Sequence, residues 1–201
     1  MAGLFAALVL LGALAWTMRA FIDLPSGVDT EKPVQKDPRL PELMKLAAAN
    51  DSIAEYELAR MYGNGYGVEK SLKEEQKWLE RAARHGNGQA QYEYGVALRD
   101  GRGTVQDYEG ARKWMQLAAD SGNGQAQLAL GLMYRTGLGF PIDNVKAYVW
   151  LNVAAAQGVP GANAARDMVL PRLSPAELQE AQAEARKMGE LYLPKAPPTA
   201  Q

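Results

Sequence analysis

The sequence predicts an all-α protein, a right-handed α-solenoid of stacked helix-turn-helix repeats that is preceded by a single transmembrane helix. Trp78, Trp114 and Trp150 are 36 residues apart, and several glycines and alanines recur at the same step. A fixed period of this length is typical of repeat architectures. The second observation is a stretch without any charged residue from Ala2 to Met18, which is long enough to begin a membrane span.

The first predicted element is a membrane anchor over residues 1–22. Its leucines, valine and phenylalanine each favour insertion by roughly 0.3 to 0.6 kcal/mol, and Arg19 lies late enough in the span for its side chain to reach the headgroups. A cleaved signal peptide is the alternative, because residues 13–15 have the small-x-small form, although the usual basic region before them is missing. The basic residues that follow the span weakly favour a cytoplasmic C-terminal domain.

Residues 23–41 are expected to form an extended linker. They contain four prolines and charges of both signs, with no apolar period. Such a linker would hold the following domain away from the membrane surface. A structured loop packed on that domain is the alternative.

Each repeat is expected to contain two helices. In the central unit, apolar residues from Ala90 to Leu98 recur at helical spacing and stop at Gly101, which predicts a first-type helix ended by glycine. After a turn, residues 108–120 carry a second apolar face, which predicts a second-type helix that ends before Gly122. A two-helix unit cannot bury its apolar face alone, so the units are expected to stack.

The predicted solenoid extends over residues 42–192. Its three full units cover about 52–87, 88–123 and 124–159, with capping helices at both ends. At the C-terminal end, residues 174–177 form a capping box with proline at the first helical position, and the helix is expected to run to about Met188. Its outer face is expected to be polar, and residues 193–201 are expected to be a disordered tail.

The segment AQYEYGVALRDGRGTVQDYEGARKWMQLAADSGNGQAQ resembles the Sel1-like repeat, a relative of the tetratricopeptide repeat, and the pattern can be followed through all three units. The resemblance implies an α-solenoid that acts as an interaction scaffold, in a family with diverse partners. It also favours a periplasmic domain of a bacterial protein.

Composition excludes several function classes. The chain has no cysteine, one histidine (His85) and a net charge of −1, so thiolate or imidazole metal sites, a cysteine nucleophile and a nucleic-acid-binding surface are not expected. We therefore predict no enzyme activity, no catalytic residue, no cofactor and no metal. His85 is expected to act as a helix cap. The carboxylate pairs Glu55 with Glu57 and Glu74 with Glu75 are expected to lie on solvent-exposed faces.

The candidate partner-binding site is the concave face, which by analogy with tetratricopeptide packing is lined by the first-type helices. Tyrosine and arginine beside aliphatic residues is a mixture enriched at binding hot spots. For Tyr56, Tyr92 and Leu128, packing against the adjacent first-type helix is the alternative role. The candidate residues are Tyr56, Arg60, Tyr92, Val96, Arg99, Leu128, Leu132 and Arg135.

These features favour a membrane-tethered, non-enzymatic protein-protein interaction scaffold, an accessory or assembly subunit of a larger membrane complex. Its partners would be proteins, with the membrane contacted through residues 2–22. The expected location is the inner membrane as a single-pass protein, with the periplasmic side slightly favoured over the cytoplasmic side. Two alternatives stay open: an exported cell-envelope protein that binds cell-wall glycan or another small ligand, and a hydrolase.

Overall fold

The computed structural model describes residues 36–192, and the regular elements within this range are all helical. The predicted anchor (1–22), most of the predicted linker (23–35) and the predicted tail (193–201) lie outside the described residues. Among the helices that are described, none combines the length and the apolar character needed to cross a membrane.

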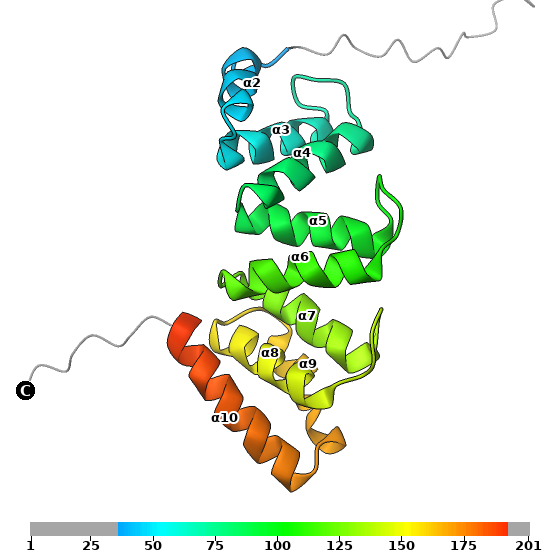
Figure 1. Cartoon of the computed structure of the whole chain (residues 1–201), viewed down its shortest axis with the longest axis vertical. Coiled ribbons are helices and arrows are strands. Elements are labelled where there is room, and N and C mark those ends of the chain that lie inside the picture. The colour runs from blue at the N-terminus through cyan, green and yellow to red at the C-terminus, as the bar shows by residue number, and fades with distance from the viewer. Residues whose placement is uncertain (1–35, 193–201) are drawn as a thin grey trace, which may run out of the picture. The chain divides into compact units, whose positions relative to one another are not determined.

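Three pairs of antiparallel helices follow one another through the described unit, with a shorter element before them and three after them (Figure 1). The loops inside the three pairs all lie along one edge of the stack (Figure 1). The pairs are α3 (Ser52–Asn64) with α4 (Leu72–Arg84), α5 (Gly88–Asp100) with α6 (Tyr108–Asp120), and α7 (Gly124–Thr136) with α8 (Asn144–Ala156). Before them lies α2 (Leu40–Ala48), and after them lie α9 (Ala162–Asp167), the 3-10 helix η1 (Leu170–Arg172) and α10 (Pro175–Tyr192).

Side-chain caps start all six paired helices. The first-type helices α3, α5 and α7 have Asp51, Asn87 and Asn123 at the N-cap, each accepting a hydrogen bond from a backbone N–H of the first turn. Ser71, Asp107 and Asp143 do the same for α4, α6 and α8. These side chains satisfy donors that a helix leaves without an internal partner. The short polar residues repeated every 36 positions therefore set where each helix begins.

Small residues let the two helices of a pair approach closely. A Cβ atom added to Gly95 would lie 2.9 Å from Met115 Cγ, and one added to Gly131 would lie 2.7 Å from Leu151 Cγ. Ala59, at the same repeat position, is fully buried. Larger side chains at this position would separate the helices and leave unfilled space along the rest of the interface.

The tryptophans fill two different environments. Trp78 and Trp150 are buried, while Trp114 is half-buried and meets the edge of Tyr94 with 5.7 Å between ring centroids. The three units thus have the same residue type at this position, but its burial differs between them. Large aromatic side chains of this kind supply much of the apolar area that stacked helices bury.

The two ends of the stack are covered by helices that are not part of a full unit. At the N-terminal end α2 packs on α3 and buries Ala47, and at the C-terminal end α10 packs along α8 and buries Ala181 and Ala185. The polar residues expected on the outside of α10 are exposed: Glu177, Gln179, Glu180, Gln182, Glu184 and Lys187. Terminal elements with a polar outer face are what keeps an open-ended solenoid soluble.

Candidate partner-binding site

The predicted site residues lie on the first-type helices α3, α5 and α7. Tyr56 of α3 donates a hydrogen bond from its hydroxyl to Oε1 of Glu93 on α5, at 2.6 Å. Burial of the phenol, together with this hydrogen bond to a carboxylate, raises the pKa of Tyr56. The side chain is therefore a protonated donor that joins two neighbouring first-type helices.

Arg60, Tyr92 and Val96 come together in one pocket of about 290 Å³ between α3 and α5. It is named here the α3–α5 pocket. Arg60 is largely exposed, whereas Tyr92 and Val96 are half-buried and also contact the apolar core of the second unit. Five residues that were not among the predicted site residues complete the lining: Gly63, Asn64, Glu75, Glu93 and Arg102.

The remaining predicted residues do not line this pocket. Leu128 and Leu132 are half-buried against the hydrophobic cluster formed by α8, α9 and α10. Arg135 lies within 3.6 Å of the Met168 sulfur, and its Nε is buried. Arg99 is held by its neighbour Asp100 at 2.7 and 2.9 Å, a pairing that raises the pKa of the guanidinium. The first-type helices thus offer a pocket near the N-terminal end of the stack and a packed surface near the C-terminal end.

Two carboxylates expected on solvent-exposed faces are buried, so this part of the sequence interpretation was wrong. Glu55 is fully buried and Glu75 is 7% exposed. The other members of the two pairs, Glu57 and Glu74, are only partly buried. The reason is helical geometry, because helical residues one or two positions apart point about 100° or 200° apart, and only one member of each pair faces the neighbouring helix.

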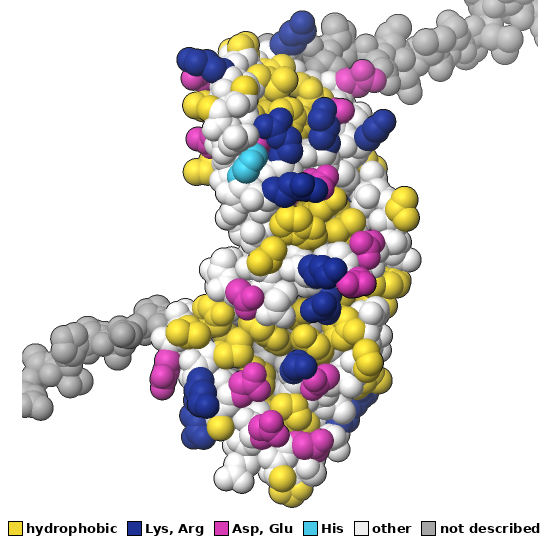
Figure 2. Space-filling model, in the orientation of Figure 1, with side chains coloured by type: hydrophobic (Ala, Val, Ile, Leu, Met, Phe, Trp, Pro, Cys, Tyr) yellow, Lys and Arg dark blue, Asp and Glu magenta, His cyan; other side chains and the backbone are white. Residues whose placement is uncertain are grey.

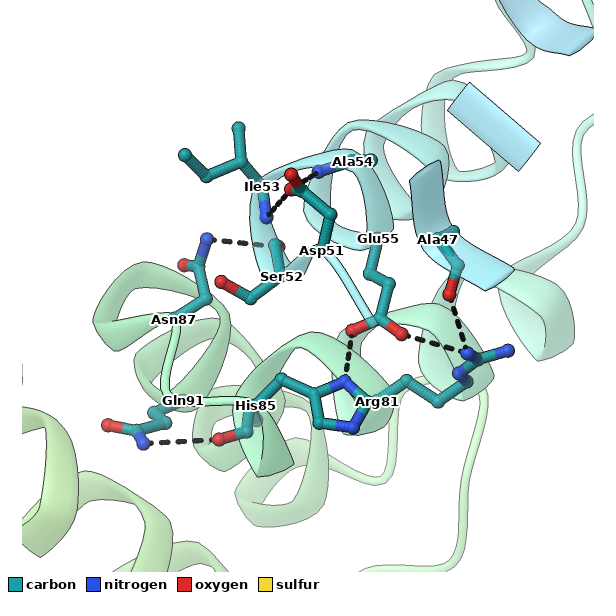
Figure 3. A network of polar contacts seen from close by, with 11 residues as sticks. Ala47, Asp51, Ser52, Ile53, Ala54, Glu55, Arg81, His85, Asn87 and Gln91 are labelled. Atoms are coloured by element: carbon teal, nitrogen blue, oxygen red, sulfur yellow. Dashed lines mark hydrogen bonds and ion pairs between the residues drawn. The ribbon is translucent and has the colours of Figure 1, made fainter. Parts of the chain in front are cut away.

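Glu55 is the centre of a polar cluster that joins α2, α3 and α4 (Figure 3). His85 Nδ1 lies 2.6 Å from Glu55 Oε2, and the Arg81 guanidinium lies 2.9 Å from Oε1 in an ion pair whose angle is not that of a hydrogen bond. The same Arg81 nitrogen donates to the carbonyl of Ala47 at 2.9 Å. His85 is the C-cap residue of α4, as the sequence indicated, but its imidazole also binds a buried carboxylate.

A signal for these buried carboxylates is present in the repeat itself. Glu55 occupies the position of Gln91 and Gln127 in the next two units, and all three side chains are buried. Glu75 occupies the position of Ala111 and Ala147, which are fully buried. The other two units have a neutral amide at the position of Glu55 and an alanine at the position of Glu75. A glutamate in place of these residues indicates that its surroundings differ in the first unit. Comparison of the units position by position would have found both.

The surface around His85 is visible in Figure 2. The histidine lies at the surface near the N-terminal end of the stack, with lysine and arginine side chains close by (Figure 2). Arg81 also stacks over Trp78, with 4.9 Å between Cζ and the ring centroid. Within residues 36–192, no group of three or more histidine, cysteine, aspartate or glutamate side chains is placed to hold a metal ion.

Comparison with protein families finds the Sel1 repeat model at three consecutive segments, residues 52–87, 88–123 and 124–159. These segments coincide with the three helix pairs and their following loops. No curated protein matches the chain.

Solved structures are also similar to the chain, among them the following two. The crystal structure of a Sel1 repeat protein from Oxalobacter formigenes has 37% sequence identity and a TM-score of 0.60, over 64% of this chain and 96% of that chain. The structure of c5321, a protective antigen present in uropathogenic Escherichia coli strains and displaying an SLR fold, has 26% identity and a TM-score of 0.59. That match covers 81% of this chain and 44% of the antigen.

Proposed function

Because the chain belongs to the Sel1 repeat family, whose members generally mediate protein-protein interactions, we propose that it is a membrane-tethered, non-enzymatic scaffold that binds a polypeptide partner. It would serve as an accessory or assembly subunit of a larger membrane complex. The observation that carries the proposal is the α3–α5 pocket, in which Arg60, Tyr92 and Val96 meet.

The chemistry of the pocket suits a polypeptide segment. Arginine, tyrosine and an aliphatic side chain lie beside carboxylates, so the pocket offers donors, acceptors and apolar contact within one small volume. Such mixtures are enriched where interfaces concentrate their binding energy. At about 290 Å³, the pocket can take one side chain of a partner, and the rest of the segment would lie across α3 and α5.

The tether rests on the sequence of the N-terminal segment. Residues 2–18 contain no charge, and this stretch with the three apolar residues after Arg19 reaches the length of a membrane span. A single-pass anchor in the inner membrane, with the solenoid on the periplasmic side, is the arrangement we propose. Protease accessibility in intact spheroplasts tests the side, and the mass of the mature N-terminus tests whether the segment is retained.

The binding proposal is tested by purifying the full chain with its partners from detergent-solubilised membranes. In the variant Arg60→Val/Tyr92→Leu, each pocket residue is replaced by one that another unit carries at the same position, Val96 and Leu128 respectively. We expect the fold to persist and a stoichiometric partner to be lost. The matched control is Lys113→Ala/Leu117→Ala, which removes one cation and one apolar side chain from exposed positions of α6.

The control should recover the same partner as the wild type. Recovery of that partner in equal amount by the pocket variant would show that the α3–α5 pocket is not the binding site. Failure of the wild-type chain to recover any stoichiometric protein would contradict the scaffold function itself.

A further inference from the structure

The first repeat departs from the other two at a pair of positions that face each other. Gly63 of α3 stands where the later units have Arg99 and Arg135, and Glu75 of α4 stands where they have Ala111 and Ala147. The change to glycine removes a side chain from the first-type helix, while the change to glutamate adds one on the second-type helix. A glycine inside a helix costs about 1 kcal/mol relative to alanine, so the exchange is not favoured by helix propensity.

The side chain of Glu75 occupies the space that Gly63 leaves. A Cβ atom at Gly63 would lie 2.8 Å from Glu75 Cδ and 2.9 Å from Oε1, so any larger residue would displace the carboxylate. The Glu75 side chain is only 9% exposed and forms part of the wall of the α3–α5 pocket. Its Oε2 is buried and has no hydrogen-bond partner within the described part of the chain.

A buried carboxylate oxygen without a partner is costly, and native proteins seldom keep one without a reason. If filling the space beside Gly63 were the only role of this side chain, an apolar residue would serve without that cost. The unsatisfied oxygen is therefore the second observation, besides the pocket itself, that points to a ligand carrying hydrogen-bond donors.

The two carboxylates that line the pocket have few cationic partners of their own. The pocket is lined by two guanidinium groups, those of Arg60 and Arg102, and by Glu75 and Glu93, but Arg60 pairs with Glu57 outside the lining, at 3.7 Å. Glu93 accepts hydrogen bonds from the neutral side chains of Tyr56 and Gln89, and no ion pair of Glu93 occurs in residues 36–192. Glu93 is thus a carboxylate of the lining without an ion-pair partner in the described residues, and a cation bound beside Glu75 would be attracted by both carboxylates.

Arg102 is a weak internal partner for Glu75. Its Nη2 lies 3.3 Å from Oε1, which is longer than the roughly 2.7 to 2.9 Å of a strong hydrogen bond between charged groups. The Arg102 side chain is 46% exposed and comes from the loop between α5 and α6, so it can move aside at little cost to the fold.

From these contacts we propose that the α3–α5 pocket is a specificity site for a basic residue, in which Glu75 binds the ammonium or guanidinium group of a lysine or arginine in the partner polypeptide. The inference rests on the proposed scaffold function and adds the chemistry of the side chain that is recognised. The ligand cation supplies donors to Oε2, and Arg102 competes with it for the carboxylate. Tyr92 and Val96 contact the aliphatic part of the bound side chain.

The test uses the full chain in detergent micelles and a phage-displayed library of random peptides as the probe. Peptides selected by the wild type are synthesised, and each is paired with a copy in which the recurring basic residue is replaced by methionine. Dissociation constants are measured for the wild type and three variants: Glu75→Gln, Arg102→Gln and the matched control Glu74→Gln. Glu74 is adjacent in sequence but lies outside the pocket and pairs with Lys77 at 3.1 Å.

We expect the selected peptides to share one lysine or arginine, and Glu75→Gln to weaken their binding at least about tenfold. Arg102→Gln should strengthen binding, because it removes the competing cation, and Glu74→Gln should leave it unchanged. The methionine peptides should bind weakly and should not distinguish the wild type from Glu75→Gln, since the two changes remove the same interaction.

Several results would overturn the inference. Selected peptides without a shared basic residue, or with equal affinity for the wild type and Glu75→Gln, would exclude Glu75 as the recognition group while leaving the scaffold function intact. Weaker peptide binding by Arg102→Gln would also exclude Glu75 as the recognition group. If Glu75→Gln fails to fold, the Arg102→Gln variant still decides the test. Selection of no peptide, together with recovery of no membrane partner, would contradict the scaffold function and the inference together.

Discussion

At the scale of single residues, one repeat position shows how the same burial is satisfied by different chemistry. Gln91 donates from Nε2 to the carbonyl of Ala83, and Gln127 donates to the carbonyl of Ala119. Each of these carbonyls lies near the C-terminus of the preceding second-type helix, where backbone acceptors lack helical partners. Glu55 has no donor to offer to the equivalent carbonyl of Ala47, and Arg81 donates to it instead.

His85 completes this substitution. The imidazole of His85 lies against Glu55, which precedes it by 30 residues. In the third unit, Gln157 donates a hydrogen bond of 2.8 Å to Gln127, which also precedes it by 30 residues. The first and third units therefore place an equivalent contact between the start of a helix pair and its end. The contact joins a carboxyl group to an imidazole in the first unit and joins two amides in the third. The single histidine of the chain is explained by this structural role.

Replacement of His85 by alanine is expected to lower the free energy of unfolding by about 1 to 3 kcal/mol, because it leaves the buried Glu55 Oε2 without its partner. His85→Gln should cost less, since Gln157 makes the same contact from an amide in the third unit. Urea unfolding of both variants measures the difference.

Lys77→Ala is the matched control for this pair. The Lys77 ammonium pairs with Glu74 at the surface, where ion pairs contribute little to stability, so no clear change in unfolding is expected. A cost for His85→Ala as small as that of Lys77→Ala would show that Glu55 is satisfied without the imidazole.

At the scale of secondary-structure elements, glycines with positive φ shape the loops inside the helix pairs and the loops that follow them. Gly139 has a φ of 83°, and a Cβ atom there would overlap with Cβ of Tyr108 at the start of α6. Gly158 has a similar φ of 76°, but a Cβ atom there would meet nothing within 4 Å. Gly139 is thus needed both for its backbone conformation and for the close approach between two units. Gly158 is needed for its conformation alone.

Gly139→Ala is accordingly expected to destabilise the protein more than Gly158→Ala. The left-handed conformation costs an alanine roughly 1 to 2 kcal/mol in both variants. Gly139→Ala adds the cost of displacing Tyr108, about 1 to 3 kcal/mol for an overpacked contact. Denaturant unfolding of the two variants compares them directly, and equal losses would mean that the loop after α7 shifts freely away from α6.

At the scale of the whole described unit, stability is expected to follow the order of the stack. Each helix pair contacts mainly the pairs before and after it, so a change at one end should be felt most by its neighbours. The C-terminal end depends on α10, which covers the apolar surface of α8 with Ala181, Ala185 and Met188.

Ala181→Asp/Ala185→Asp should detach α10, because it places two charges on the buried face of that helix. Hydrogen exchange is expected to accelerate in α8 and to remain unchanged in α3 and α4. The control Gln179→Asp/Gln182→Asp makes the same kind of change on the exposed face and should leave α8 protected. Equal acceleration in α3 and α8 would indicate that the stack unfolds as a single cooperative unit.

Much of this architecture could be predicted before any coordinates. The 36-residue step of Trp78, Trp114 and Trp150 indicated the repeat, and apolar residues at helical spacing that stop at glycine indicated its two helices. Of the candidate site, Arg60, Tyr92 and Val96 meet in one pocket, while Leu128 and Leu132 pack against the C-terminal helices. Glu75 was missed because the repeat pattern is defined by the residues that the three units share, and Glu75 differs from Ala111 and Ala147 at its position.

The sequence by itself determined the two-helix unit, its period and its membership in a family of solenoids, because turns, caps and helical periodicity act over a few neighbouring residues. Only the tertiary structure decided which side chains meet across helices. The contact of Glu55 with His85 and the placement of Glu75 against Gly63 depend on how far each helix is rotated and how closely it approaches its neighbour. Those quantities are set by the packing of all the surrounding side chains at once, which no local pattern contains.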